Sequence, residues 1–318
     1  MSIAIAVCII TFRRPLGLEK LLAHLAKQEG ISRDEVLVVV VDNDPEGSAR
    51  PIAEAARRGG LTIAYAEEPV PGIPRSRNRS VEIALASGAA RLCFLDDDEY
   101  PSPTWLVRLH GHAAATEAPV VTGPVLPVLP EGAPSYLAGS RIFTPRRYRT
   151  GQRRDRAATG NAVVDRRVFE AMEPWFDESM ALTGGTDTEL FRRAHTAGFA
   201  IEWCDEAVVY EDVPRERCSL RWIGRRHFRQ SLGSARFGRR YGGGGIAMAR
   251  ILAIGSYRFM LGLALSVLTL GIVPSLRLRL VENLSSGAGL LLGGFGVTLD
   301  EYRRADRAAI ALERPPAR

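Results

Sequence analysis

The chain has 318 residues, of which 46% are hydrophobic, so it is long enough for one large domain or for one domain with an appendage. Its formal net charge is +6, and its 42 basic residues are all arginines except Lys20 and Lys27. The four cysteines form no C-x-x-C pair, which argues against a zinc site and a disulfide framework and indicates buried thiols in a reducing compartment.

Strand-like and helix-like patterns alternate through the first third of the chain. Leu18, Leu21, Leu22 and Leu25 recur with helical spacing, whereas branched apolar residues fill 36–41, as expected of a strand buried on both faces. This rhythm predicts an α/β domain in which helices cover both faces of a mostly parallel sheet. We expect strands at 3–10, 36–41, 61–66 and 92–95, and helices at 15–28, 46–58, 74–86 and 104–116.

The apolar start of the chain is shorter than a signal peptide and has no basic region ahead of it. We therefore interpret it as the first strand and expect the protein to work on the cytosolic side. The middle of the chain is less regular. Prolines in 124–134 indicate a connector, and 141–156, which contains seven arginines and one acid and has almost no apolar periodicity, is expected to be a mobile loop. Further strands are expected near 162–164 and 207–210, and helices at 187–197 and 220–237.

The last eighty residues become apolar. The segment 259–276 contains 18 residues without a charge, at the lower limit for a membrane span, and a second apolar run covers 285–299. Arginines on both sides favour contact with a membrane, and the alternative is a buried helical hairpin. We predict a catalytic domain at 1–240, a membrane-associating hairpin at 241–300 and a polar tail at 301–318.

Four consecutive acids, Asp96, Asp97, Asp98 and Glu99, follow the fourth predicted strand. Adjacent carboxylates repel one another, so they need either water or a cation to compensate them. Side chains alternate along a strand, which would place Asp96 and Asp98 on the same side. Two such carboxylates can hold Mg²⁺ or Mn²⁺ and, through it, phosphate groups.

Six motifs in order carry a family resemblance: TFRRP (11–15), VVDND (40–44), PGIPRSRNRSVEIA (71–84), FLDDDEYP (94–101), TGNAVVDRRVFE (159–170) and GGTDTELFRRAHTAGF (184–199). The chain thereby resembles the family 2 inverting glycosyltransferases of GT-A fold. The arginine-rich helix at 221–237 and the apolar runs after it are similar to bacterial exopolysaccharide and succinoglycan-type members.

The resemblance implies roles for individual residues. Asp98 would hold the metal, Mg²⁺ or Mn²⁺, and Asp187 would be the general base, although Thr186 replaces the glutamate that usually precedes it. The nucleotide sugar would be bound by Thr11, Asp42, Arg77, Asn78, Asp96 and Asp97. The donor sugar or the acceptor would lie near Gly160, Asn161, Trp175, Arg225 and Arg226.

Several of these residues also have an ordinary structural interpretation. Asp42 and Asp187 could each cap a helix, since aspartate is a favoured capping residue. Arg77 could lie on a solvated helix face, and Trp175 could belong to the core.

The resemblance implies transfer of a sugar from a nucleotide donor to a lipid-linked or polysaccharide acceptor at the cytoplasmic face of a bacterial membrane. One alternative is a sugar-1-phosphate nucleotidyltransferase, which usually has a glycine-rich loop near its start where this chain has TFRRP. Another is a nucleic-acid-binding protein, suggested by the arginine clusters. That alternative leaves the four acids unexplained, so we expect no nucleic-acid partner.

Overall fold

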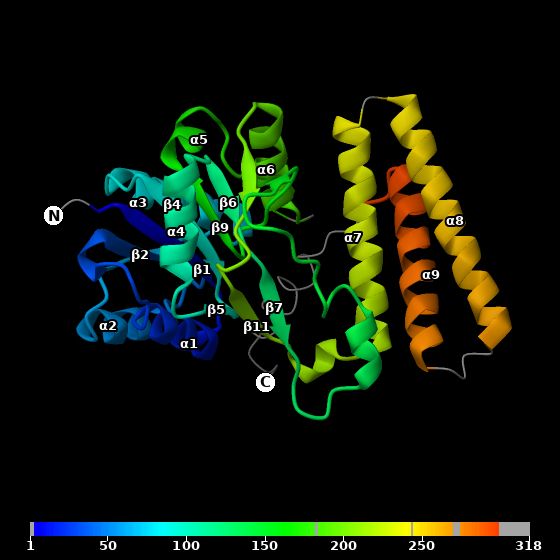
Figure 1. The fold of residues 1–318 in the computed structure, drawn as a ribbon, viewed down its shortest axis with the longest axis horizontal. Helices are drawn as coiled ribbons and strands as arrows, with labels where there is room; N and C mark the ends of the chain where they lie inside the picture. The colour runs from blue at the N-terminus through cyan, green and yellow to red at the C-terminus, as the bar shows by residue number, and fades with distance from the viewer. Residues whose placement is uncertain (1–2, 182–183, 243, 270–273, 299–318) are drawn as a thin grey trace, which may run out of the picture. The chain divides into compact units, whose positions relative to one another are not determined.

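The computed structural model describes residues 3–181, 184–242, 244–269 and 274–298, and the described residues form two compact units. The sheet unit comprises the described parts of Met1–Val128, Pro145–Ala181 and Thr186–Asp212. The helical unit comprises those of Leu129–Thr144, Leu182–Gly185 and Val213–Arg318 (Figure 1). The tail predicted at 301–318 lies outside the described residues.

The main sheet of the sheet unit has its strands in the order β3-β2-β1-β4-β9-β6-β10-β8. The first four are parallel, β9 runs antiparallel to both of its neighbours, and β10 is parallel to β6. This confirms the expected mostly parallel sheet. The strands are β1 (Ile5–Thr11), β2 (Val36–Asp42), β3 (Ile63–Glu67), β4 (Arg91–Asp96), β6 (Val120–Thr122), β8 (Arg153–Arg154), β9 (Ala162–Asp165) and β10 (Ile201–Trp203).

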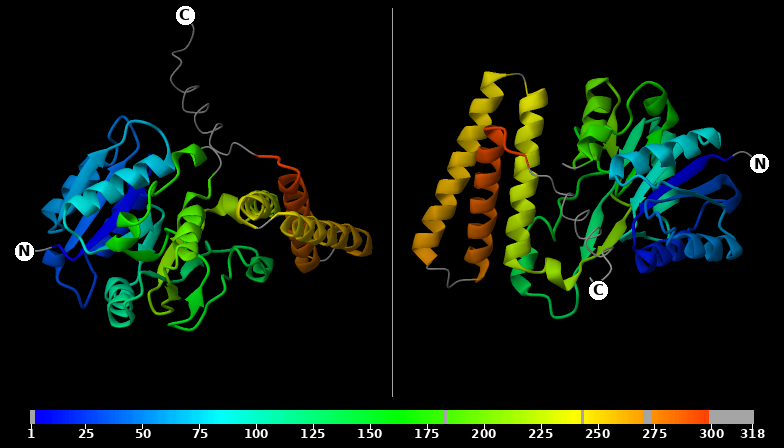
Figure 2. Two further views of the ribbon diagram at one scale, coloured as in Figure 1. Left: turned by 90° about the horizontal axis from the view of Figure 1, so that it is seen from above. Right: turned by 180° about the vertical axis from the view of Figure 1, so that it is seen from behind.

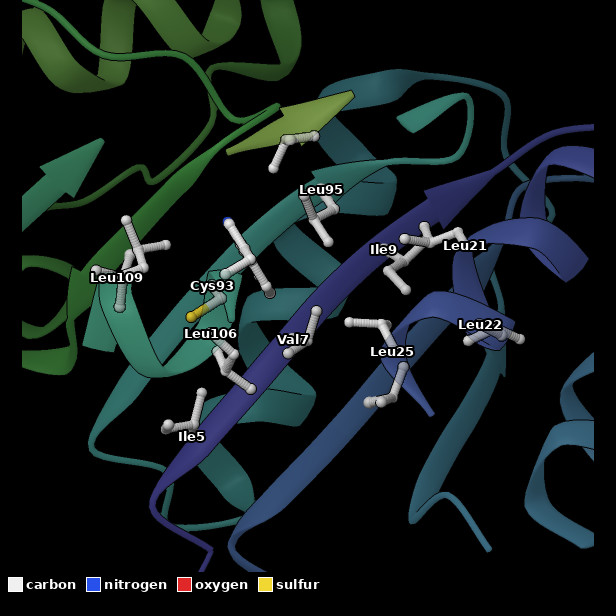
Figure 3. Packing of buried hydrophobic residues seen from close by; sticks show 14 of the residues in the cluster. Ile5, Val7, Ile9, Leu21, Leu22, Leu25, Cys93, Leu95, Leu106 and Leu109 are labelled. Carbon is white, nitrogen blue, oxygen red and sulfur yellow. The ribbon is translucent and has the colours of Figure 1, made fainter. Parts of the chain in front are cut away.

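Helices cover both faces of this sheet, as the apolar periodicity predicts. One hydrophobic cluster joins the sheet to α1, α2 and α4, and four of the five leucines of α1 are among its buried members. Figure 3 labels Leu21, Leu22 and Leu25. A second cluster joins the other face to α3, α5 and α6. Burial of each large apolar side chain contributes about 1.5–3 kcal/mol, so the two clusters fix the sheet. The helices are α1 (Pro15–Leu25), α2 (Arg50–Arg58), α3 (Ile73–Ala86), α4 (Trp105–Thr116), α5 (Arg166–Glu170) and α6 (Thr186–Thr196).

A second sheet of three strands has the order β5 (Glu99–Pro101), β11 (Val209–Asp212), β7 (Val125–Val128). The expectation of a plain connector at 124–134 was therefore wrong for its first residues, which form β7. Pro127 fits because β7 is an edge strand, where a missing N–H interrupts no pairing on the open side. Strands of two to four residues are too short to show a period, which is why several were not expected.

Three long helices form most of the helical unit: α7 (Leu220–Tyr241), α8 (Gly245–Thr269) and α9 (Pro274–Gly294). They lie side by side in both views of Figure 2. Glycines permit the close approach, because a Cβ at Gly287 would lie 2.5 Å from the Phe259 nitrogen and one at Gly289 would lie 2.4 Å from the Phe228 oxygen. The glycine run after Tyr241 thus lies between two helices of one compact unit. That 1–240 forms a domain separate from 241–300 stays a prediction.

The uncharged run 259–276 does not form one helix, because α8 ends at Thr269 and α9 begins at Pro274. Among the described residues, a stretch that is long and apolar enough to cross a membrane lies earlier, at Gly245–Ser266, and only 11% of its most apolar window is buried. Large apolar side chains are exposed on these helices: Ile246, Ile254, Tyr257, Met260 and Leu263 on α8, and Leu292 on α9.

Candidate active site

The carboxyl ends of three parallel strands bring expected site residues together. Thr11 at the end of β1 is in register with Asp42 at the end of β2, and Ile10 is in register with Asp96 at the end of β4. Ligands of open α/β sheets bind at this edge. The sheet topology therefore gathers Thr11, Asp42 and Asp96 from distant parts of the chain.

The four consecutive acids form a tight connection between two sheets, which we call the acid turn (96–99). Strand β4 ends at Asp96, Asp97 and Asp98 form the turn, and β5 begins at Glu99. Strand alternation therefore ends at Asp96, so the expected placement of Asp96 and Asp98 on the same side does not follow from strand geometry. Tertiary contacts, rather than strand geometry, decide where these carboxylates point.

Arg14 is the main cation beside the acid turn. Its Nη1 lies 3.0 Å from Asp97 Oδ1 and 2.9 Å from Asp98 Oδ2, and Thr11 Oγ1 donates to Asp97 Oδ2 at 2.8 Å. Burial nevertheless raises the pKa of Asp97 to about 6, against the opposing influence of Arg14 and Thr11. Arg14 is not among the site residues predicted from the sequence, although it lies within the TFRRP motif.

Arg77 compensates Asp96 from the helix α3. Its Nη2 lies 3.0 Å from Asp96 Oδ1, and its guanidinium lies over the ring of Phe176, so it is buried rather than on a solvated face. Burial raises the pKa of Asp96, Arg77 lowers it, and the charges of Asp98 and Asp187 raise it further. Asp187 therefore acts electrostatically on the acid turn even though it comes from a different motif.

Glu99 is a second residue that the sequence analysis did not assign to the site. It is buried, its Oε2 accepts a hydrogen bond of 2.9 Å from the Asp96 nitrogen, and burial beside Asp96 raises its pKa well above the usual range. Gly160 lies against this carboxyl, since a Cβ there would be 2.3 Å from Glu99 Oε1. Gly160 thus leaves space for the Glu99 carboxyl. The position of Glu99 as the last of four consecutive acids could have identified it as a site residue.

Asp42 has a different environment. Its side chain is fully buried, Oδ1 accepts from the Asp44 nitrogen at 3.0 Å, and Oδ2 accepts from the Ala49 nitrogen at 2.7 Å and from the Tyr65 hydroxyl at 3.1 Å. These bonds fix the loop that follows β2 and leads to α2. The geometry favours the structural alternative, and a contact between Asp42 and a nucleotide stays a prediction.

Two asparagines of the predicted site also bind backbone. Asn78 Nδ2 donates to the Phe176 oxygen at 3.0 Å, and its Oδ1 accepts from the Phe176 nitrogen at 2.9 Å. Asn161 is buried, accepts from Trp105 Nε1 at 2.9 Å and donates to the oxygens of Pro124 and Ala207. Both side chains hold segments around the acid turn in place.

Asp187 lies in the first turn of α6 and is half-buried. Its Oδ1 accepts a hydrogen bond of 2.7 Å from the Thr188 nitrogen. The neighbouring Glu189 is buried and paired with Arg193 at 2.8 Å, so it stabilises the helix from within. Of these two acids, Asp187 is the one that is partly open to solvent.

The remaining predicted residues are not gathered at the acid turn by any contact in the described parts of the chain. The indole nitrogen of Trp175 donates to the Phe169 oxygen at 2.8 Å, and its ring packs edge-on against Phe169 in the core. Arg225 and Arg226 are exposed on α7 of the helical unit. Their part in binding sugar or acceptor stays a prediction.

The donor set of the acid turn fits a divalent cation that shares its shell with a ligand. No group of three or more His, Cys, Asp or Glu side chains among the described residues could hold a metal by itself. The side chains of Asp96 and Asp98 keep 40% and 31% of their surface exposed. Mg²⁺ commonly uses one or two carboxylates and completes its shell with phosphate and water, so these two oxygen donors suit it.

Comparisons with known proteins place this arrangement in a family. Residues 6–172 match the glycosyl transferase family 2. A curated relative, the succinoglycan biosynthesis protein ExoM of Rhizobium meliloti (strain 1021), is 36% identical over 236 residues, which cover 72% of each chain.

Two solved structures share the fold. TarS 1-349 of S. aureus in complex with UDP-GlcNAc has a TM-score of 0.54 at 16% identity and covers 90% of both chains. The mannosyltransferase PcManGT from Pyrobaculum calidifontis, in complex with GDP-Man and Mn²⁺, has a TM-score of 0.56 at 17% identity and covers 99% of this chain and 82% of its own. The expected GT-A fold is thereby confirmed, and the sequence matches show that the chain belongs to the glycosyl transferase family 2.

Proposed function

We propose that the protein transfers a sugar, with inversion and with the help of a divalent cation, from a nucleoside-diphosphate sugar to an acceptor hydroxyl. The observation that carries this proposal is the pair of partly exposed carboxylates in the acid turn, Asp96 and Asp98, each of which is held by an arginine. Carboxylates of this kind suit a divalent cation and, through it, a diphosphate.

In the proposed reaction, Asp187 accepts the proton of the acceptor hydroxyl as that oxygen attacks the anomeric carbon. The bond between the anomeric carbon and the diphosphate oxygen breaks on the opposite face, and the nucleoside diphosphate leaves with the electron pair. A bound Mg²⁺ or Mn²⁺ would be held by Asp98 with Asp96, and it supplies charge stabilisation to the leaving diphosphate. A single displacement inverts the anomeric centre and needs no covalent enzyme intermediate.

Arginines of the site would keep the carboxylates in place for this reaction. Arg14 contacts Asp97 and Asp98, and Arg77 contacts Asp96. Charges that a protein fixes in advance around the reacting groups supply much of the rate enhancement of many enzymes. Glu99 accepts a hydrogen bond from the Asp96 nitrogen, and Gly160 leaves space for the Glu99 carboxyl, so both residues support the backbone of the acid turn.

The comparisons support nucleotide sugars as donors and a surface polysaccharide as product. The solved neighbours bind UDP-GlcNAc or GDP-Man, and the curated relative acts in succinoglycan biosynthesis. We infer that this chain builds a cell-surface polysaccharide on a lipid-linked or polysaccharide acceptor.

We also infer attachment to the cytoplasmic face of a bacterial membrane through the helical unit. Helix α8 exposes Ile246, Tyr257 and Met260 and also carries Arg250 and Arg258. Apolar side chains beside arginines suit an interface with anionic lipid headgroups. Membrane fractionation of the full chain and of one ending at Gly242 tests this, and a full chain that stays soluble without detergent would contradict it.

A hydrolysis screen tests the central proposal. The purified full chain is incubated with a panel of UDP-, GDP- and dTDP-sugars and Mn²⁺, Mg²⁺ or EDTA, and release of the nucleoside diphosphate is measured. We expect one donor to be hydrolysed with a metal and not with EDTA. Release from no donor, together with formation of a nucleotide sugar and pyrophosphate from a sugar 1-phosphate and a nucleoside triphosphate, would support the nucleotidyltransferase alternative.

A further inference from the structure

A group of arginines in the sheet unit is not used by the proposed reaction. Arg146, Arg149 and Arg153 are exposed, and Arg154 is half-buried beside them in the chain; we call these four the basic surface. No ion pair joins any of the four to a carboxylate in the described parts of the chain. By contrast, their neighbours Arg147 and Arg156 are paired with Asp205 and Asp155.

The segment that carries the basic surface is fixed to the sheet rather than loose. Strand β8 pairs with β10 at the end of the main sheet, and the Gly151 nitrogen donates to the Trp203 oxygen at 2.8 Å. Arg147 Nε donates to Asp205 Oδ1 at 2.9 Å, and Thr150 Oγ1 donates to Glu206 Oε2 at 2.5 Å. These contacts use nearby acids to anchor the backbone, so the charge of the three exposed arginines, Arg146, Arg149 and Arg153, is left for a partner.

Aromatic contacts show which kind of polyanion suits the surface. Arg154 lies 3.6 Å and Arg146 5.4 Å from the ring centroid of Tyr148, and the ring packs edge-on against Trp203 at 5.1 Å. The tyrosine ring is therefore engaged by the protein. Single-stranded nucleic acids bind largely by stacking their bases on free aromatic rings, and Tyr148 does not offer one.

The surroundings also differ from those of a membrane-binding surface. The large hydrophobic side chains that are exposed in the described structure include none between 145 and 160, whereas α8 has several. A bilayer favours apolar side chains beside the basic ones. The basic surface thus suits a water-soluble chain with fixed negative charges, such as carboxylates, which guanidinium groups bind through two parallel hydrogen bonds.

The segment that carries the basic surface leads to a residue that packs against the acid turn. Arg154 precedes Gly160 by six residues, which span at most about 22 Å when extended, and Gly160 packs against Glu99. We propose that the basic surface binds an acidic polysaccharide, the acceptor chain of the transfer reaction. This inference rests on the proposed function and specifies its substrate as an anionic glycan.

Binding of polygalacturonate, a polysaccharide with one carboxylate per sugar, tests the proposal on the full chain in detergent. Dextran serves as the neutral probe. We expect binding of polygalacturonate that weakens steeply with salt, and no binding of dextran. The double variant Arg149→Gln/Arg153→Gln should bind about tenfold more weakly, as expected from the loss of two exposed ion pairs. Arg149→Lys/Arg153→Lys should stay within a few-fold of the wild type.

The matched control, Lys27→Gln/Arg58→Gln, removes the same charge from exposed positions after α1 and at the end of α2. Its affinity for polygalacturonate should stay within about twofold of the wild type, as expected for surface charges away from the binding surface. Equal losses in the two glutamine variants, or equal binding of dextran, would overturn the proposal.

Nucleotide-sugar hydrolysis by the same proteins keeps this inference separate from the proposed function. We expect hydrolysis to be the same in the wild type and in all variants. A wild type that hydrolyses its donor but does not bind polygalacturonate would overturn the acidic acceptor and leave the transferase function standing. Tighter binding of RNA or anionic vesicles than of polygalacturonate, lost in Arg149→Gln/Arg153→Gln, would also overturn it by assigning the surface to another partner.

Discussion

Two aspartate environments at one edge of the sheet show how scaffold and site differ. Asp42 ends β2, is fully buried and accepts three hydrogen bonds from protein donors. Asp96 ends β4 and Asp98 follows in the turn, and both keep a third or so of their side-chain surface exposed while arginines hold them. Position on the sheet is therefore not enough to identify a binding residue. What distinguishes the acid turn is charge that the protein only partly compensates.

The largest expected effect is that of replacing the proposed base, Asp187. Asp187→Asn should lower the rate of sugar transfer by about 10²–10⁴-fold, the usual range for loss of a general base. Donor affinity and melting temperature should remain close to those of the wild type, because the amide keeps the size and the local hydrogen bond of the carboxylate. Steady-state transfer, calorimetric titration with the nucleoside diphosphate and thermal unfolding provide the three measurements.

Glu189→Gln is the control for this comparison, because Glu189 is buried and paired with Arg193. It should lower stability while turnover per folded molecule stays near normal. If Asp187→Asn instead lowered the melting temperature and kept turnover, Asp187 would only support the helix.

The second-largest effect tests whether the partly exposed carboxylates of the acid turn hold the metal, as the buried Asp42 does not. Asp98→Asn should lower transfer at limiting Mn²⁺ by at least about 10–100-fold, because losing a group that only supports a metal ligand already costs this much. Higher Mn²⁺ should recover part of the rate, since Asp96 remains. Titration of activity with Mn²⁺ after EDTA treatment measures this, and equal activity of wild type and variant in EDTA would remove the metal from the mechanism.

Substitution of Asp42 should lower stability, whereas substitutions in the acid turn should lower activity. Asp42→Ala leaves the buried nitrogens of Asp44 and Ala49 without their acceptor, which should lower the free energy of unfolding by about 2–3 kcal/mol. Chemical denaturation measures this loss. Nucleoside-diphosphate affinity per folded molecule then decides between the two roles, because a marked loss of affinity would show that Asp42 also binds the base.

A smaller effect concerns the pH dependence of stability through Asp97. Its pKa is raised to about 6, so between about pH 4 and pH 6 only the unfolded chain ionises and the free energy of unfolding falls as the pH rises. Asp97→Asn removes this titration. The free energy of unfolding of the variant should therefore rise by about 2 kcal/mol relative to that of the wild type from pH 4 to pH 7, measured by denaturation in EDTA. A constant difference would show that the folded-state pKa of Asp97 is ordinary.

Much of the sheet unit was predictable because its signals are local. The runs that form β1, β2 and β4 are apolar throughout most of their length, and the leucine spacing of α1 is helical, so burial alone identifies them. The short strands β5 and β10 were not predicted, because three residues carry no period and form only where a neighbouring strand offers its edge. The helix boundary between α8 and α9 was missed for a similar reason, since an uncharged run does not reveal a reversal of direction.

The sequence by itself determined the family, the alternation of strands and helices in the first third of the chain, and the placement of acids after β4, because each depends on residues close together in the chain. Only the tertiary structure decided which cations and neighbouring groups surround each of these carboxylates. Arg14 and Arg77 reach the acid turn from the start of α1 and from α3, and Gly160 makes room for Glu99 from a distant segment of the chain. Compensation of a buried charge depends on atoms within a few ångströms, and folding alone brings those atoms together.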